Sequence, residues 1–204
     1  LSETSDTARL DAELLMAEAL GVTRSELLLR HTADQVPPSF AQLIQRRAAN
    51  EPVAYILGHQ EFYGRSIIVT PDVLIPRGDS ESVVDAALEF MPNRGRILDC
   101  GTGSGALLLT LLAQRPEAEG FGIDRSLGAL AVAAANAARL GVQDRAKLLH
   151  LDWHEAGWSA GLGRFDLIIA NPPYVETDAN LSPSVRAFEP GEALFAGIDG
   201  LDDY

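Results

Sequence analysis

The amino-acid sequence predicts an α/β protein, in which a doubly wound parallel sheet follows a small helical domain and a β-hairpin. From residue 80 onward helical and extended patterns alternate, which is typical of parallel sheets with right-handed crossovers. A glycine-rich run at 101–105 follows the first extended segment, where such sheets bind ligands. Residues 1–50, in contrast, show helical periodicity alone.

The first predicted domain, residues 1–50, is helical. Apolar residues at helical spacing indicate its first helix, namely Leu10, Leu14, Leu15 and Ala19. Gly21 is placed to end that helix in a left-handed conformation. Ser25 precedes a second short helix, and the run Pro37-Pro38-Ser39 begins a third. We expect these helices to form a small bundle.

Residues 51–76 have a different character. Prolines and glycines interrupt short β-type runs at 67–69 and 73–75, and this spacing predicts a hairpin. We interpret the segment as a linker between the helical bundle and the sheet.

Residues 77–204 form the third predicted domain. We expect helices at 80–90, 106–114 and 127–140, and strands at 96–99, 120–124, 147–151 and 165–170. A complete doubly wound sheet usually has more strands than these. We therefore expect this domain to be truncated, with further strands belonging after Tyr204.

The composition restricts the partners. The chain of 204 residues has 16 Lys and Arg against 29 Asp and Glu, a formal net charge of −13. This balance weighs against tight binding to duplex nucleic acid, because Lys and Arg supply much of that affinity. No apolar run approaches the roughly 18 residues of a membrane helix, and the N-terminal residues resemble no secretory signal. With Cys100 as the one cysteine, we expect a cytoplasmic protein without a membrane segment.

The first candidate site is the run Asp99-Cys100-Gly101-Thr102-Gly103-Ser104-Gly105. Its glycines allow the backbone to approach a ligand and to turn into the next helix, whose first N–H groups favour an anion. The spacing differs from the dinucleotide-binding fingerprint, and Asp99 would repel a pyrophosphate but accept hydrogen bonds from an ammonium group. An α-amino acid carries both charges, and S-adenosylmethionine is one such ligand.

Two more acidic positions end predicted strands. Asp124 could accept hydrogen bonds from both hydroxyls of a ribose. Asp152 could accept from an adenine amine while Trp153 packs on the adenine face, although a tryptophan at a strand end is equally good core material. His150 and His154 flank this pair, but without a third ligand they predict no metal site.

The last candidate site is the tetrapeptide Asn171-Pro172-Pro173-Tyr174, which follows the final predicted strand. Two prolines can neither donate to a sheet nor continue a helix, so the chain leaves the strand in a stiff, extended turn. A planar nitrogen could donate one N–H to the Asn171 side chain and one to the Pro172 carbonyl, while Tyr174 stacks on its plane. The nitrogen would then face a sulfonium methyl group in a near-attack geometry.

Taken together, these motifs resemble those of class I, Rossmann-like methyltransferases that use S-adenosylmethionine and act on planar nitrogen. Three other stretches are similar to the PrmC/HemK family of protein-glutamine methyltransferases: residues 45–58, which contain Gln45-Arg46-Arg47 and Glu51-Pro52; the segments 61–64 and 73–77; and 188–201. One departure is Gly78, since the family usually has proline there, and it removes a fixed φ before the next helix.

This resemblance implies methylation of the side-chain amide nitrogen (N5) of the glutamine in the Gly-Gly-Gln motif of peptide-chain release factors, which tunes translation termination. It implies that residues 1–50 help to hold the release factor, and that 77–204 carry the reaction. Cofactor contacts are then expected at residues Asp99, Gly101, Thr102, Gly103, Ser104, Gly105, Asp124, Asp152, Trp153 and Asn171. The glutamine is expected at Asn171, Pro172, Pro173 and Tyr174.

Three other interpretations remain open at this point. The same tetrapeptide suits the exocyclic amine of an adenine or guanine, so a nucleic-acid amino-methyltransferase is the main alternative. The acidic balance and the helical N-terminal domain count against it. A nicotinamide-dependent oxidoreductase fits the glycine spacing poorly, and a non-catalytic binding protein would not need an intact Asn-Pro-Pro-Tyr segment.

Overall fold

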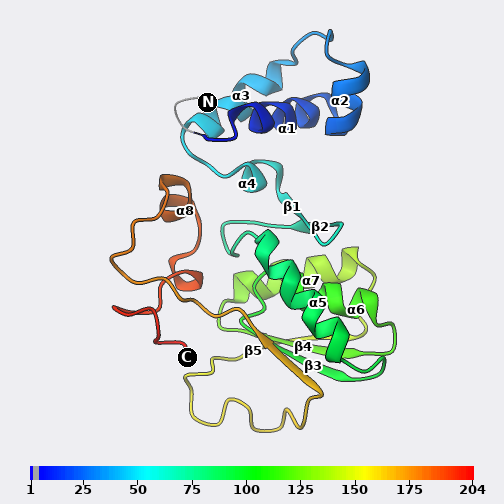
Figure 1. Ribbon diagram of the computed structural model, residues 1–204, viewed down its shortest axis with the longest axis vertical. Coiled ribbons are helices and arrows are strands. Elements are labelled where there is room, and N and C mark those ends of the chain that lie inside the picture. The colour runs from blue at the N-terminus through cyan, green and yellow to red at the C-terminus, as the bar shows by residue number, and fades with distance from the viewer. Residues whose placement is uncertain (2–4) are drawn as a thin grey trace. The chain divides into compact units, whose positions relative to one another are not determined.

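The computed structural model describes residues 1 and 5–204, so positions 2–4 of the predicted helical domain lie outside the described residues. The chain divides into two compact units (Figure 1). One comprises Leu1–Gly58 with Leu181–Phe188, and the other comprises His59–Asn180 with Glu189–Tyr204. We divided the chain by expected role into a helical domain (1–50), a linker (51–76) and a catalytic domain (77–204). These bounds differ from those of the two compact units, and the division by role stays a proposal.

The first unit is helical. Its helices are α1 (Ala8–Leu20), α2 (Arg24–Arg30), α3 (Pro38–Ala48), α4 (Val53–Leu57) and α8 (Pro183–Phe188). Gly21 ends α1 at φ 68°, in the left-handed conformation that we predicted. The start of α2 was predicted wrongly, because Thr23, not Ser25, caps it: its hydroxyl accepts from the Glu26 N–H, and the Glu26 carboxylate accepts from the Thr23 N–H.

The apolar stripe predicted for α1 also needs correction. Leu10 is 40% exposed, whereas Asp11 is buried beside Leu15. Arg47 Nε on α3 donates to Asp11 Oδ2 at 2.7 Å, and the Ser5 hydroxyl donates to the same oxygen. Because these bonds satisfy the carboxylate, a charged residue can take the inward position that a hydrophobic pattern assigns to leucine.

The predicted hairpin exists, but one of its strands was misplaced. β1 (His59–Phe62) pairs antiparallel with β2 (Arg65–Ile68) around a turn in which Tyr63 and Gly64 have positive φ. Residues 73–75, which we expected to be a strand, form none. They are apolar because Val73 and Ile75 are buried in the core, and short apolar runs cannot distinguish burial from pairing.

The second unit is built on a parallel sheet in the order β5-β4-β3-β6. Its strands are β3 (Arg96–Cys100), β4 (Glu119–Asp124), β5 (Ala146–His150) and β6 (Leu167–Ala170). Between or before them lie α5 (Glu81–Phe90), α6 (Ala106–Gln114) and α7 (Leu127–Arg139). The α/β fold and its alternation of helix and strand are as predicted, with element ends shifted by a residue or two.

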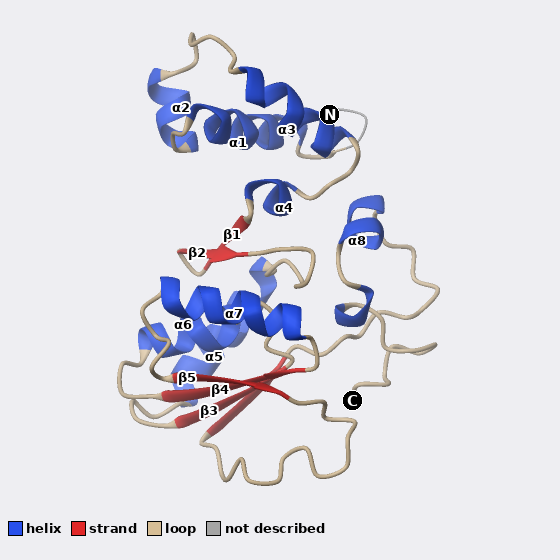
Figure 2. Ribbon diagram, turned by 180° about the vertical axis from the view of Figure 1, so that it is seen from behind, coloured by secondary structure: helices blue, strands red, loops and turns tan. Residues whose placement is uncertain are grey.

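The core has two layers of different construction. Figure 2 shows α5, α6 and α7 on one face of the sheet, where Ile97, Leu108 and Leu112 are among the fully buried side chains. The opposite face packs Leu98, Phe121 and Ile123 against the irregular segment 151–166, which contributes Leu162.

The strand order creates a switch point. The chain moves outward from β3 through β4 to β5, then returns to the other side of β3 as β6. Open α/β sheets bind ligands at the carboxyl ends of the strands where this reversal occurs. The 3₁₀ turns Gly78–Ser80 and Gly191–Ala193 belong to the same unit. At Gly78 an added Cβ would meet no atom within 4 Å, so no contact there requires glycine.

Candidate functional site

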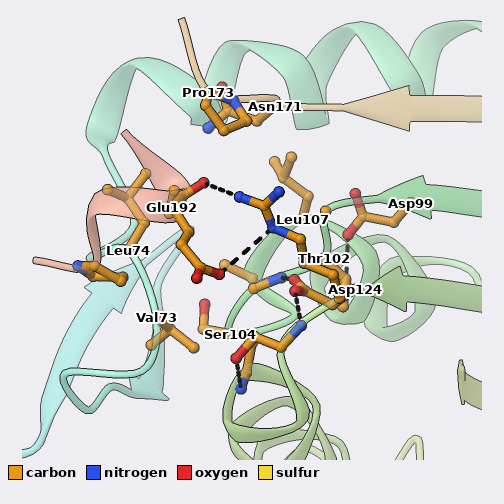
Figure 3. A pocket seen from close by; sticks show the side chains of 18 of the residues that line it. Val73, Leu74, Asp99, Thr102, Ser104, Leu107, Asp124, Asn171, Pro173 and Glu192 are labelled. Carbon is orange, nitrogen blue, oxygen red and sulfur yellow. Dashed lines mark hydrogen bonds and ion pairs between the residues drawn. The ribbon is translucent and has the colours of Figure 1, made fainter. Parts of the chain in front are cut away.

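A pocket lies at the carboxyl ends of the strands in the second unit (Figure 3). Ten of the predicted site residues line it: Asp99, Gly101, Thr102, Gly103, Ser104, Asp124, Asp152, Trp153, Asn171 and Pro173. Gly105, Pro172 and Tyr174 do not line it. The predicted cofactor segments and the beginning of the Asn-Pro-Pro-Tyr segment therefore share one cavity.

Strand register brings these segments together. Cys100 at the end of β3 lies opposite Ala170 at the end of β6, so the glycine loop and Asn171 leave neighbouring strands at the same level. On the other side Cys100 lies opposite Ile123, whose carbonyl accepts hydrogen bonds from the N–H groups of Gly101 and Thr102. Asp124 is the next residue, and it therefore also reaches the cavity.

The glycine loop is held by its own tight packing. Gly105 caps α6 at φ 78°, and an added Cβ would lie 2.6 Å from Leu109 Cδ1. A side chain is therefore excluded both by backbone conformation and by space. Gly103, at φ 54°, meets nothing within 4 Å where a Cβ would be, so its backbone is open to a ligand.

Asp99 lies beneath this loop, and only 1% of its surface is exposed. The Thr102 hydroxyl donates to Asp99 Oδ2 at 2.7 Å. The other oxygen, Oδ1, is buried without a hydrogen-bond partner among the described residues. Burial, with a smaller contribution from the charge of Asp124, raises the pKa of the Asp99 carboxyl to about 7. A buried acceptor without a donor fits a ligand that carries an N–H group.

Asp124 organises the next part of the site. Its Oδ2 accepts from the Gly103 N–H and its Oδ1 from the Ser126 N–H, both at 2.9 Å (Figure 3). A carboxylate has about four acceptor positions, so each oxygen keeps one for a ligand. Asp124 thus fixes the glycine loop and still offers two acceptor positions to two adjacent hydroxyl groups of a ligand.

Asp152 and Trp153 follow β5. Asp152 Oδ1 accepts from the backbone N–H and from the ring of His154, each at 2.9 Å, and these contacts lower the pKa of Asp152. A Cβ on Gly101 would lie 3.2 Å from Trp153 Cη2, so the indole covers that glycine. Trp153 also packs against the apolar cluster around Leu98. It therefore combines the two roles, core and pocket wall, that the sequence left open.

The Asn-Pro-Pro-Tyr segment is anchored unevenly. Pro173 is buried, whereas Asn171 and Tyr174 are exposed, Tyr174 by 62%. Figure 3 shows Asn171 and Pro173 at one wall of the cavity. Over the described part of the chain, no residue hydrogen-bonds the Asn171 side chain, and its amide is available to a ligand.

Sequence reasoning missed several lining residues. The segment after the hairpin contributes Val73, Leu74, Pro76 and Arg77, and the segment 190–193 contributes Pro190, Glu192 and Ala193. Arg125, directly after Asp124, reaches Glu192 with 3.5 Å between Nε and Oε2. The sequence had suggested a strand at 73–75 and a family resemblance for both segments, but no role at the site, because side chains of such mixed character carry no motif of their own.

No metal centre emerges from the described residues: nowhere in 1 and 5–204 do three or more His, Cys, Asp or Glu side chains gather as a metal ion would require.

Comparisons of the sequence with known proteins point to one family. Residues 1–58 match the PrmC N-terminal domain, and 81–188 match the methyltransferase small domain. Release factor glutamine methyltransferases are similar to nearly the whole chain. The protein of that name from Caulobacter vibrioides is 42% identical over 98% of this chain and 70% of its own length. The one from Cereibacter sphaeroides is 44% identical over 98% of this chain and 71% of its own length. The one from Bordetella pertussis is 45% identical over 95% of this chain and 72% of its own length.

Solved structures are less similar. A methyltransferase from Thiobacillus denitrificans, in complex with S-adenosyl-L-homocysteine, is 25% identical with a TM-score of 0.39, over 58% of this chain and 44% of that one. The family assignment depends on the sequence matches. On those matches, this chain belongs to the release factor glutamine methyltransferase family.

Proposed function

We propose that this protein transfers a methyl group from S-adenosylmethionine to the side-chain amide nitrogen (N5) of the glutamine in the Gly-Gly-Gln motif of peptide-chain release factors. One observation carries the proposal: the pocket joins the glycine loop over Asp99 to Asn171 and Pro173, which follow the neighbouring strand β6. The reaction is the one named for relatives that are 39–45% identical.

The residues present fit the cofactor. Asp99 Oδ1, buried and without a donor, suits its ammonium group. The remaining acceptor positions of Asp124 suit the ribose hydroxyls, and Asp152 with Trp153 suits the adenine. When bound, S-adenosylmethionine supplies the electrophilic methyl group. These residues position it, and they also bind the product S-adenosylhomocysteine.

The second part of the site acts on the amide. Asn171 Oδ1 and the Pro172 carbonyl accept the two N–H groups of the glutamine side chain, and Tyr174 stacks on the amide plane. The N–C bond forms as the C–S bond breaks, and the nitrogen then loses one proton to water. Both carbonyl oxygens favour the transition state, because positive charge develops on the nitrogen as it takes the methyl group.

The proposal also defines the partner and its compartment. The substrate is the Gly-Gly-Gln loop of a release factor, and residues 1–50 help to hold that factor. Transfer takes place in the cytoplasm and involves no direct contact with nucleic acid. Among the helices that the structure describes, none has both the length and the apolar character to cross a membrane.

The test is methyl transfer to defined acceptors. The purified protein is incubated with S-adenosylmethionine carrying a labelled methyl group and with a release factor, and the modified residue is identified by peptide mass spectrometry. A release factor with the motif glutamine replaced by alanine is the matched control. We expect one methyl group on the motif glutamine and none on the control. Label found only in parallel incubations with DNA or RNA would overturn the proposal in favour of an amino-methyltransferase of nucleic acid.

A further inference from the structure

Glu189 lies where the chain rejoins the second unit. After Asn180 the chain passes through Leu181–Phe188, which belongs to the first unit, and Glu189 is the first residue of the second unit again. Only 1% of the Glu189 side chain is exposed. A carboxylate buried to this degree is stable only where partners satisfy its oxygens.

Both of its oxygens bond the segment that follows the hairpin. The Ile75 N–H donates to Glu189 Oε2 at 3.2 Å, and Arg77 Nη2 donates to Oε1 at 2.7 Å. The two segments are more than a hundred residues apart in the sequence, as the separations of 114 and 112 show. One carboxylate therefore fastens residues 75–77 to the start of the segment 189–196.

The segment 189–196 in turn holds the exit of the Asn-Pro-Pro-Tyr tetrapeptide. The Val175 N–H donates to the Leu194 carbonyl at 2.8 Å, and the Ala196 N–H donates to the Val175 carbonyl at 2.9 Å. Val175 follows Tyr174 directly, so these two bonds fix the position at which the tetrapeptide ends. Between Glu189 and Leu194, the chain lines the cavity with Pro190, Glu192 and Ala193.

Glu189 thus fastens one wall of the pocket to another. The segment 73–77 lines the cavity with Val73, Leu74, Pro76 and Arg77. Glu189 bonds this segment to the segment 189–196, which in turn hydrogen-bonds Val175. Asn171 has no side-chain hydrogen bond within residues 5–204 to fix it. Its position therefore depends on the backbone at both ends of the tetrapeptide: β6 before it and Val175 after it.

We propose that Glu189 is a positioning residue for methyl transfer. Through Arg77 and Ile75 it holds the segment 189–196, and this segment holds the exit of the tetrapeptide that receives the glutamine amide. The inference rests on the proposed function for its kinetic consequence, but its structural part stands independently. Glu189 does not line the pocket, so its effect on the reaction is indirect.

The test compares Glu189→Gln with a matched control, Glu81→Gln. Glu81 also binds a backbone N–H of a distant segment, that of Tyr63 at 2.7 Å, but it does not line the pocket. For Glu189→Gln we expect kcat at saturating cofactor to fall about 10-fold, because a misplaced acceptor weakens catalysis more than binding. Glu81→Gln should keep the wild-type kcat even if its Tm is lower. A Glu189 variant with lower Tm and unchanged kcat would show a merely structural bond and refute the inference.

A second measurement makes the result independent of the substrate. Hydrogen exchange at the amides of Val175 and Ala196 should become at least about 10-fold faster in Glu189→Gln, while amides of β3 and β4 keep their protection. In Glu81→Gln both amides should exchange at the wild-type rate. Unchanged protection at Val175 and Ala196 would overturn the inference even for an active enzyme. If the wild type fails to methylate a release factor, the proposed function fails, and this exchange experiment still decides the role of Glu189.

Discussion

The two ends of the pocket are constructed differently. At the glycine loop, Asp99, Thr102 and Ser104 are buried, and the Gly103 N–H is already bonded to Asp124. At the tetrapeptide, Asn171 and Tyr174 are exposed. The first end is preformed by the protein's own hydrogen bonds. The second presents exposed side chains that no described residue hydrogen-bonds, so they are open to a ligand.

Prolines explain how the second end can be exposed and still ordered. Pro172 and Pro173 restrict φ without any side-chain hydrogen bond, and Pro173 is also buried. The acceptors at Asn171 and Pro172 are therefore held mainly through the backbone. This difference predicts that substitutions in the tetrapeptide lower turnover, whereas substitutions at the glycine loop weaken cofactor binding.

The largest effect is expected for Asn171→Ala. It removes the acceptor proposed for the reacting amide, and loss of one such group typically lowers kcat by about 10²–10³-fold. The dissociation constant of S-adenosylhomocysteine should stay within about 3-fold of wild type, because Asp99 and Asp124 remain in place. Single-turnover methylation and calorimetry measure the two quantities.

Asn171→Gln serves as the control, since it keeps the amide but moves it by one methylene group. It should also be slow, because the acceptor must lie in hydrogen-bond reach of the nitrogen. A normal kcat for either variant, or weakened cofactor binding without loss of turnover, would show that Asn171 does not hold the glutamine.

A smaller effect on a different quantity is expected for Asp124→Ala. The change removes the acceptors proposed for the ribose and leaves the N–H groups of Gly103 and Ser126 without their partner. We expect about 10–100-fold weaker binding of S-adenosylhomocysteine, as lost charged hydrogen bonds contribute roughly 1.5–3 kcal/mol. Asp124→Asn should be intermediate, because it keeps one acceptor oxygen. Wild-type affinity in calorimetry would exclude the ribose contact.

The sequence predicted the helices and strands better than their arrangement in space. The helix at 106–114 and all four strands of the sheet were recognisable from local patterns. The strand order was not, so the adjacency of Cys100 and Ala170 became visible only in the structure. The strand predicted at 73–75 was wrong for a similar reason: those residues are apolar because they are buried by distant parts of the chain, which local patterns do not show.

Single polar residues were the hardest to foresee. Asn136 lies in an alanine-rich helix, yet it is fully buried and bonds both the N–H and the carbonyl of Ile68 and the carbonyl of Ser104. It thereby connects the hairpin to the glycine loop. Glu189 is comparable, with partners more than a hundred positions away. Neither residue belongs to a motif whose chemistry can be read locally, so only tertiary contacts reveal what they do.

The smallest effect concerns the proton on Asp99. Its pKa in the folded protein is about 7, above the ordinary value of an aspartate. Between roughly pH 4 and 7 the folded state holds a proton that the unfolded state has lost, so the contribution of Asp99 to stability falls as the pH rises through this range. Asp99→Asn should flatten that part of the stability curve, as denaturant unfolding at several pH values would show.

The same group should respond to the cofactor. An ammonium at Oδ1 favours the ionised carboxylate, so binding of S-adenosylhomocysteine near about pH 6 should release close to one proton. Calorimetry in buffers with different ionisation enthalpies measures this release, and Asp99→Asn should abolish it. Equal proton release by the wild type and the variant would place the ammonium elsewhere. A release confined to the wild type would show that the preformed end of the pocket still adjusts its charge to the ligand.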